Sequence, residues 1–340
     1  MLEEIYYWIK GIICSFCSPN SNSNDYSKDT RYDYSNEYNH LNSNNDSNNY
    51  YNRYCNRDCN SNYYSNNEVY QIDNDLHQEM NSYYEALDII KYSTIISNTK
   101  SSSVYLHNNY IYKLVDFPSC YDLYKYCNTI DQLEDNSNIL YPLEMTYRKT
   151  SLIEKYNYIP DCDLFELITN YTTTQNEKYK IILSVMEAIS QLHKAGFAHR
   201  DIKPENLFYL PNNKILLIDL IMCSRYDDPL HFKGGTVYYA SPQIFQENYI
   251  ENDWRKNDIW SLGIVIYVIQ QQFFPWRNAT NCDIYLSYKN YDNKQEYWDS
   301  IDNKVISKLL FNSLVINPNE RKDINQLIEI FKNEIDISNL

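Results

Sequence analysis

A chain of 340 residues accommodates one large domain or two smaller ones, with some sequence left over. Its formal net charge of −15 provides no overall positive field to hold a phosphate backbone, so we expect no nucleic-acid partner. The nine cysteines lack the density of a secreted disulfide scaffold, and the apolar runs are too short to span a bilayer. Together these features exclude a secreted disulfide-rich or membrane-spanning protein and favour a reducing, cytoplasmic compartment.

Residues 1–17 form a short apolar and aromatic segment, for which we expect a helix or an anchor. Glu3 and Glu4 stand where a secretory signal carries basic residues, so we do not interpret this segment as a cleaved signal. Cys14 and Cys17 follow the apolar run, which suggests reversible palmitoylation and peripheral attachment to a membrane. Docking of the helix on the rest of the chain or on a partner is an open alternative.

Residues 18–70 consist almost entirely of Asn, Ser, Tyr and Asp. With so few aliphatic side chains, burial cannot offset the conformational entropy lost on ordering. The composition therefore predicts a disordered low-complexity tail.

Short runs with strand character alternate with polar turns between residues 92 and 158. The runs are STIIS, SVYLH, YIYKLV and SLIEKY, and one helix is expected within 120–135. This alternation predicts a small β-rich lobe over residues 83–156.

The following part, residues 157–335, has helical periodicity. Apolar residues recur at helical spacing in 176–196, and Gly196 is a helix-ending signal. Residues 257–273 and 325–335 are also predicted to be helical, so this half is expected to be mainly α.

A polar loop separates the helix that ends near Gly196 from the apolar strand KILLIDLI. Asp201 could accept or orient a hydroxyl proton, and Lys203 could neutralise charge on a transferring phosphoryl group. Asn206 and Asp219 carry oxygen atoms suited to magnesium. This spacing predicts phosphoryl-transfer chemistry.

Residues 199–206, HRDIKPEN, resemble the catalytic loop of eukaryotic protein kinases in the form typical of serine/threonine kinases. Residues 235–243 resemble the end of the activation segment, and 258–263 resemble the helix that braces the catalytic loop. Arg321 matches a late arginine whose glutamate partner is here Gln243, which predicts a neutral hydrogen bond. The resemblance implies an α+β, two-lobed protein kinase fold with a small β-rich N-lobe and a larger, mainly α C-lobe.

In the resembling family a glycine-rich loop binds the nucleotide phosphates. The segment from Ile96 to Val104 is in register with it, but Ser97, Thr99 and Ser102 stand where the glycines belong. Ile96 and Val104 are implied nucleotide contacts, while a plain polar turn is an open alternative for this segment.

Lys113 corresponds to the lysine that contacts the α- and β-phosphates, and Ile111 replaces a small residue beside the adenine. A lysine that only covers apolar surface is the alternative interpretation. The glutamate expected to pair with Lys113 cannot be placed, although Cys127 falls near its position.

Residues 156–165 align with the hinge between the two lobes. The resemblance implies that Tyr156 guards the back of the nucleotide pocket, Tyr158 borders the adenine and Asp163 contacts the ribose. Phe208 would form the pocket floor.

The resemblance implies transfer of the ATP γ-phosphate to Ser or Thr hydroxyls of protein substrates, with ATP and Mg²⁺ as cofactors. Lys113, Asp201 and Lys203 would be the catalytic residues, and Asn206 and Asp219 the metal ligands. Thr236 is expected to hydrogen-bond Asp201 and Lys203. Substrates with basic sites are suggested by Glu205, which stands where some members of the family bind a substrate arginine, and the acidic charge of the chain agrees.

The alternative is a pseudokinase that binds partners without turnover. The missing glycines, Ile111 and the unplaced glutamate favour this alternative, as does Ile221, which replaces the glycine expected two residues after the metal aspartate. A third hypothesis is a membrane or condensate adaptor that acts through the tail. For the activation segment, we hypothesise that Asp227 and Asp228 pair with Arg200 in place of a phosphate.

Overall fold

The computed structural model describes most of the chain beyond the tail, namely residues 81–99, 101–133, 136–160, 163–228, 234–246 and 253–335. Segments 1–17 and 18–70, with Cys14 and Cys17, lie outside the described residues. The chain divides into two compact units. The first unit extends as far as Lys125 and includes Pro142–Tyr158, and the second comprises Tyr126–Tyr141 and the chain from Ile159 onward. No described helix combines the length and the apolar character needed to cross a membrane.

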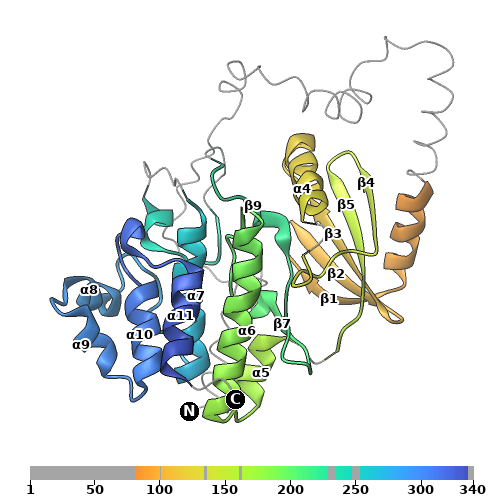
Figure 1. Ribbon diagram of the computed structural model, residues 1–340. Helices are drawn as coiled ribbons and strands as arrows, with labels where there is room; N and C mark the ends of the chain where they lie inside the picture. The colour runs from red at the N-terminus through yellow and green to blue at the C-terminus, as the bar shows by residue number, and fades with distance from the viewer. Residues whose placement is uncertain are drawn as a thin grey trace, which may run out of the picture. The chain divides into compact units, whose positions relative to one another are not determined.

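The first unit contains a five-stranded antiparallel sheet (Figure 1). The four predicted strands are present, and the β-branched and aromatic residues that fill them explain why. A further strand, β4, has charged residues at both ends, which hid it from the sequence analysis. In spatial order the strands are β1 (Thr94–Asn98), β2 (Ser102–His107), β3 (Tyr110–Asp116), β5 (Ser151–Asn157) and β4 (Glu144–Arg148).

A helix over residues 81–91 covers one face of this sheet. Tyr83 and Ile90 of the helix pack with Tyr112 of β3 and Ile153 of β5 in one buried cluster. We call this the outer face of the sheet. Because side chains alternate along a strand, the residues next to Tyr112 in β3, including Lys113, extend from the opposite, inner face.

Helix α4 (Cys120–Gln132) confirms the helix expected after the third strand. The Ser119 hydroxyl donates to the Asp122 carboxylate at 2.6 Å, and the Asp122 N–H donates back to Ser119 Oγ at 3.2 Å, which starts the helix. Residues 126–141, which include the end of α4, were expected in the small lobe but group with the second unit. The reason is that Asn138 donates to the Ile215 carbonyl at 2.8 Å and Ile139 forms a parallel β-bridge with Leu217.

The second unit is mainly helical, as expected. Helix α6 begins with a capping box between Thr174 and Glu177 and ends just before Gly196, whose φ of +90° is readily adopted only by glycine. Its helices are α5 (Leu164–Asn170), α6 (Gln175–Lys194), α7 (Arg255–Gln271), α8 (Asp283–Asn290), α9 (Lys294–Asp299), α10 (Lys304–Ser313) and α11 (Ile324–Glu334).

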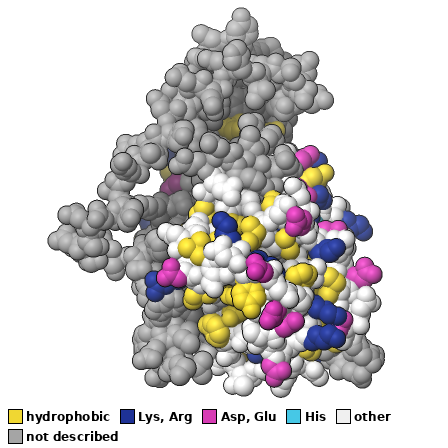
Figure 2. Space-filling model, turned by 90° about the vertical axis from the view of Figure 1, so that its left-hand side faces the viewer, with side chains coloured by type: hydrophobic (Ala, Val, Ile, Leu, Met, Phe, Trp, Pro, Cys, Tyr) yellow, Lys and Arg dark blue, Asp and Glu magenta, His cyan; other side chains and the backbone are white. Residues whose placement is uncertain are grey.

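Helix α7 is the central helix of this unit and is buried along nearly its whole length. It approaches α10 closely at Gly263, where an added Cβ would lie 2.5 Å from Ser313 Oγ and 2.8 Å from Leu314 Cδ2. A glycine is therefore required here by helix packing. Around these helices, basic and acidic side chains are interspersed with hydrophobic ones on the face shown in Figure 2.

Two short antiparallel strand pairs frame the polar loop of the sequence analysis. Strand β6 (Phe197–Ala198) pairs with β9 (Ser224–Arg225), and β7 (Leu207–Tyr209) pairs with β8 (Ile215–Leu217). The 3-10 helix η2 (Pro204–Asn206) precedes β7, and η3 (Leu220–Met222) follows β8. The polar loop therefore lies between two short strand pairs.

Candidate active site

One buried carboxylate holds the polar loop in shape. Asp258, in the first turn of α7, is 0% exposed and accepts hydrogen bonds from the backbone N–H of His199 at 2.8 Å and of Arg200 at 2.7 Å. His193 Nε2, at the end of α6, lies 2.8 Å from the same carboxylate. These bonds stabilise Arg200 at a φ of +69°, a region that few residues other than glycine adopt.

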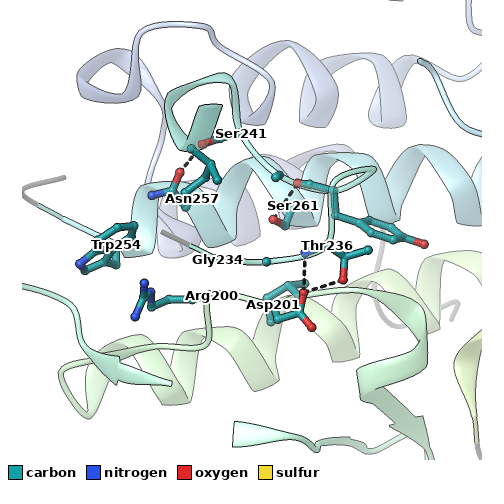
Figure 3. A pocket seen from close by; sticks show the side chains of 13 residues that line it. Arg200, Asp201, Gly234, Thr236, Ser241, Trp254, Asn257 and Ser261 are labelled. Atoms are coloured by element: carbon teal, nitrogen blue, oxygen red, sulfur yellow. Dashed lines mark hydrogen bonds between the residues drawn. The ribbon is translucent and has the colours of Figure 1, made fainter. Parts of the chain in front are cut away.

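Asp201, Lys203 and Thr236 form a closed hydrogen-bonded group. The Asp201 Oδ1 atom accepts from the Thr236 N–H at 2.9 Å and from the Thr236 hydroxyl at 2.8 Å (Figure 3). The Lys203 ammonium lies 2.8 Å from Asp201 Oδ2 and donates to Thr236 Oγ1 at 2.9 Å. The expected contacts of Thr236 are therefore confirmed, and the orientation of Asp201 is set by the activation segment.

Lys203 is held in its charged form. Burial by itself lowers the pKa of Lys203, but the opposing effects of Asp201, Glu205 and Asp219 are larger together, so its pKa is raised. A permanent positive charge beside Asp201 suits the stabilisation of a transferring phosphoryl group.

Asn206 and Asp219 present oxygen atoms close to this group. The Asn206 Nδ2 atom donates to the Asp201 carbonyl at 2.9 Å and to Asp201 Oδ2 at 3.1 Å, so the Asn206 amide offers its carbonyl oxygen to a ligand. The N–H of Ile218 donates to the Asn206 carbonyl at 3.1 Å, which brings the following residue, Asp219, to the same place. A carboxylate and an amide oxygen fit a hard cation such as magnesium.

The backbone after Asp219 has no need of the expected glycine. Asp219 has a φ of +60°, which aspartate tolerates better than most residues, while Ile221 lies within η3 and is not among the positive-φ residues. Isoleucine is therefore compatible with this turn.

The glycine-free loop between β1 and β2 is a closed hairpin. Ser97, Thr99 and Ser102 are not among the positive-φ residues, so the absence of glycine imposes no backbone strain on them. The Thr99 hydroxyl donates to the Ser102 carbonyl at 2.9 Å and accepts from the Ser102 N–H at 3.1 Å. The turn therefore uses side-chain hydrogen bonds where the family uses glycine.

The inner face of the sheet gathers four of the predicted nucleotide-binding residues. Val104 lies opposite Lys113, and Ile111 lies opposite Tyr156. Because Ile111 and Lys113 are two residues apart on β3, all four side chains extend from the same face. Ile96 occupies a β-bulge between Ile95 and Ser97 with 53% of its side chain exposed, so the strand register does not assign it to this face.

The remaining predicted nucleotide contacts lie at element ends. Tyr158 follows β5, donates its N–H to the Asn109 carbonyl at 2.9 Å and is 43% exposed. Asp163 caps α5 by accepting from the Phe165 N–H at 2.7 Å, and it forms a β-bridge with Phe208. Burial raises the pKa of Asp163 to about 6. Asp163 and Phe208 are thus brought together, as the resemblance implies.

Glu205, in the same polar loop, is half-buried, and its Oε2 atom is shielded from solvent. Its Oε2 atom has no hydrogen-bond partner among the described residues. Burial is the main reason why its pKa is raised, and the negative charges of Asp163 and Asp201 act in the same direction. A positive group of a ligand would stabilise this carboxylate.

Trp254 is a contact of the catalytic loop that the sequence analysis missed. The Arg200 guanidinium lies 4.2 Å from the centre of the Trp254 ring (Figure 3). Trp254 Nε1 donates to the Asp228 carbonyl at 2.9 Å. Asp227 lies 3.4 Å from Arg225, so the hypothesis that it serves Arg200 is corrected. Asp228 contributes a favourable charge to Arg200. In the sequence, the only sign of this contact was an aromatic residue, Trp254, shortly before the motif at residues 258–263.

The expected hydrogen bond between Arg321 and Gln243 is confirmed, with a charged donor and a neutral amide acceptor. Arg321 Nη2 donates to Gln243 Oε1 at 2.6 Å, and the Gln243 amide donates to the Ile316 carbonyl at 2.6 Å. Arg321 is 2% exposed and its guanidinium lies 4.9 Å from the ring centre of Trp260. The pair therefore connects the end of the activation segment to the helical core.

Comparison with known proteins agrees with this geometry. The family model described as "Protein kinase domain" matches residues 122–330, which is more than half of the chain. The chain therefore belongs to the protein kinase family.

Curated relatives include serine/threonine kinases. CBL-interacting protein kinase 5 of Oryza sativa subsp. japonica is 27% identical over 206 residues, covering 59% of this chain and 44% of the relative. CBL-interacting serine/threonine-protein kinase 20 of Arabidopsis thaliana is 27% identical, with 59% and 46% covered. Calcium-dependent protein kinase 5 of Plasmodium berghei (strain Anka) is 28% identical, with 64% and 36% covered. The chain thus spans less than half the length of these relatives.

Proposed function

We propose that this chain is an ATP-dependent protein kinase that transfers the γ-phosphate to Ser or Thr hydroxyls of protein substrates. The observation that carries the proposal is the group formed by Asp201, Lys203, Asn206 and Asp219 on a loop braced by Asp258. Catalysis of phosphoryl transfer depends mainly on positioning and on charge stabilisation, and this group supplies both.

Each side chain has a distinct role. Asp201, fixed by Thr236 through Oδ1, orients the substrate hydroxyl and accepts its proton. Lys203 stabilises the negative charge that develops on the transferred group. Asn206 and Asp219 would hold magnesium, which when bound neutralises charge on the nucleotide phosphates.

The inner face of the sheet supplies the nucleotide contacts in this proposal. Val104, Ile111 and Tyr156 form an apolar surface for the adenine, and Lys113 contacts the α- and β-phosphates. Asp163 accepts from the ribose hydroxyls, since a carboxylate whose pKa is about 6 is mostly ionised at neutral pH.

We also propose that preferred substrates carry a basic residue near the phosphorylated hydroxyl. Glu205 supports this proposal because its buried Oε2 has no hydrogen-bond partner among the described residues and lies in the field of Asp163 and Asp201. A peptide with arginine should be phosphorylated more efficiently than the same peptide with alanine, and Glu205→Gln should reduce that preference.

The test is transfer of labelled phosphate from ATP, with magnesium and then manganese, to generic basic proteins. The intact chain is compared with Asp201→Asn and Asp219→Ala, and with Glu144→Gln as a surface control. Incorporation that is lost in the first two variants and kept in the control supports a working kinase. Incorporation by the intact chain no greater than in these variants, across several substrates, would establish the pseudokinase alternative.

A further inference from the structure

Lys113 and Glu154 lie directly opposite each other on the neighbouring strands β3 and β5. In an antiparallel pair, directly opposed side chains extend from the same face with Cβ atoms about 4.5–5.5 Å apart. Val104 lies opposite Lys113 on β2, and Met145 lies opposite Glu154 on β4. The ammonium and carboxylate groups therefore share one row across the inner face, between two apolar residues.

Among the described strand residues, these two carry the only charges of opposite sign on that face. Among the five strands, all within the described residues, Lys113 is the one Lys or Arg on the inner face and Glu154 is the one Asp or Glu. The other charged residues of these strands extend from the outer face: Asp116, Glu144, Arg148 and Lys155. Within the sheet, Lys113 and Glu154 are therefore each other's one oppositely charged neighbour on the inner face.

The burial of Glu154 favours this pairing. Glu154 is 0% exposed, and an ionised carboxylate that is removed from water needs a cation or several hydrogen bonds to remain stable. Lys113 is the cation that the strand register supplies.

Helix α4, where the family places the glutamate, contains no glutamate. Its Asp122 accepts from Ser119 at the start of the helix, and its Asp131 is exposed to solvent. Cys127 occupies the position nearest to the expected glutamate, and Glu134 lies outside the described residues. The carboxylate on β5 is therefore the better partner for Lys113.

We propose that Glu154 is the positioning residue for Lys113, replacing the helix glutamate and holding the ammonium on the inner face of the sheet. This inference rests on the proposed kinase function. Because both partners belong to paired strands, the ion pair forms as soon as β3 and β5 pair. Displacement of α4 would leave it intact, so the orientation of Lys113 is independent of the helix.

A stability cycle on the full chain tests the pairing without reference to activity. Lys113→Met should lower the unfolding midpoint, because it leaves a buried carboxylate without its cation. Adding Glu154→Gln to that variant should raise the midpoint again. If Glu154→Gln lowers the midpoint equally with and without Lys113, the pairing is wrong.

The matched control is the pair formed by Glu144 and Lys155 on the outer face of the same sheet. Their charged atoms lie 2.8 Å apart, and their side chains are 64% and 21% exposed. Lys155→Met and Glu144→Gln should shift the midpoint much less, because exposed ion pairs contribute little to stability.

A kinetic cycle tests the positioning role. Glu154→Gln should lower kcat by about tenfold to a hundredfold, with a smaller change in KM for ATP, because Lys113 keeps its charge but loses its fixed position. Glu154→Asp should recover part of the loss. In the Lys113→Met background, Glu154→Gln should cause no further loss.

Two kinetic results would overturn the proposal. One is an equal loss of kcat with and without Lys113, and the other is an effect of Glu154→Gln no larger than that of Glu144→Gln. If the intact chain transfers no phosphate, the kinase function and the positioning role both fail. The stability cycle then still decides whether the two residues pair.

Discussion

The polar loop of the second unit and the inner face of the first unit's sheet serve the same proposed reaction but are built differently. In the loop, side chains such as Asp201 and Lys203 make the essential contacts, and the contiguous motif HRDIKPEN is kept intact. On the sheet, backbone shape and cross-strand pairing position the side chains. The glycines of the family's phosphate loop and the small residue at position 111 are replaced. In this chain, positions whose role depends on backbone geometry depart from the family's pattern, whereas the loop positions that would contact the reacting atoms keep it.

The largest expected effect is at Asp201. Asp201→Asn keeps the shape of the side chain but removes the proton acceptor, so transfer should fall by about 100- to 10,000-fold. Steady-state phosphorylation of a basic protein measures it. A loss below tenfold would contradict the role given to the side chains of the loop.

Removal of the Asp258 carboxylate, which holds the polar loop in shape, should lower stability as well as activity. Asp258→Ala leaves two buried backbone N–H groups without their acceptor and should lower the free energy of unfolding by about 3 kcal/mol. Denaturant unfolding measures this loss. An unchanged midpoint would show that the loop keeps its shape without Asp258.

Asp163 should make stability depend on pH. Its pKa is raised from 3.8 to about 6, so the folded state holds a proton that the unfolded state releases between these values, and stability falls as pH rises from about 4 to 6. Asp163→Asn keeps an acceptor for the helix cap and should remove this fall, worth about 1–2 kcal/mol after allowing for partial exposure. Unfolding at pH 4 and pH 7 checks the prediction, and equal pH dependence in both proteins would refute it.

Gln243→Glu restores the residue typical of the family and should nevertheless not stabilise the protein. The amide of Gln243 donates to the Ile316 carbonyl, and a carboxylate would place an oxygen against that carbonyl. We expect a loss of about 1 kcal/mol in the free energy of unfolding. A gain in stability would mean that the ion pair with Arg321 outweighs the lost hydrogen bond.

The smallest effect is expected when the family's glycines are restored. Ser97 and Ile221 do not have a positive φ, so glycine offers no conformational advantage at either position. Ser97→Gly and Ile221→Gly should therefore each lower stability by about 0.5–1 kcal/mol, because glycine loses more backbone entropy on folding. Neither should raise the rate of transfer. A rise of tenfold or more would contradict this expectation, because it would show that backbone freedom limits the reaction.

Much of the second unit could be predicted from sequence. Helical periodicity located α6, α7 and α11, and the contiguous polar motif located Asp201, Lys203 and Asn206, because these three residues are close in the chain and their mutual contacts are local. The hydrogen bond between Gln243 and Arg321 was also predictable, since both positions belong to recognisable motifs.

The first unit was less predictable, for physical reasons. Strand β4 has too few apolar residues to stand out, and its existence depends on pairing with β5. The partner proposed for Lys113 lies 41 positions further along the chain, at Glu154, and only the strand register places the two side by side. The contact between Arg200 and Trp254 likewise joins residues 54 positions apart.

The sequence alone was enough to predict the chemistry proposed for the polar loop, because side chains that carry out such chemistry must be of a particular type at a particular spacing. The tertiary structure was needed to propose the carboxylate that accompanies Lys113 and to find the ring that covers Arg200. It also decided whether the glycine-free turns are strained, since register, burial and backbone angles arise from the packing of distant segments.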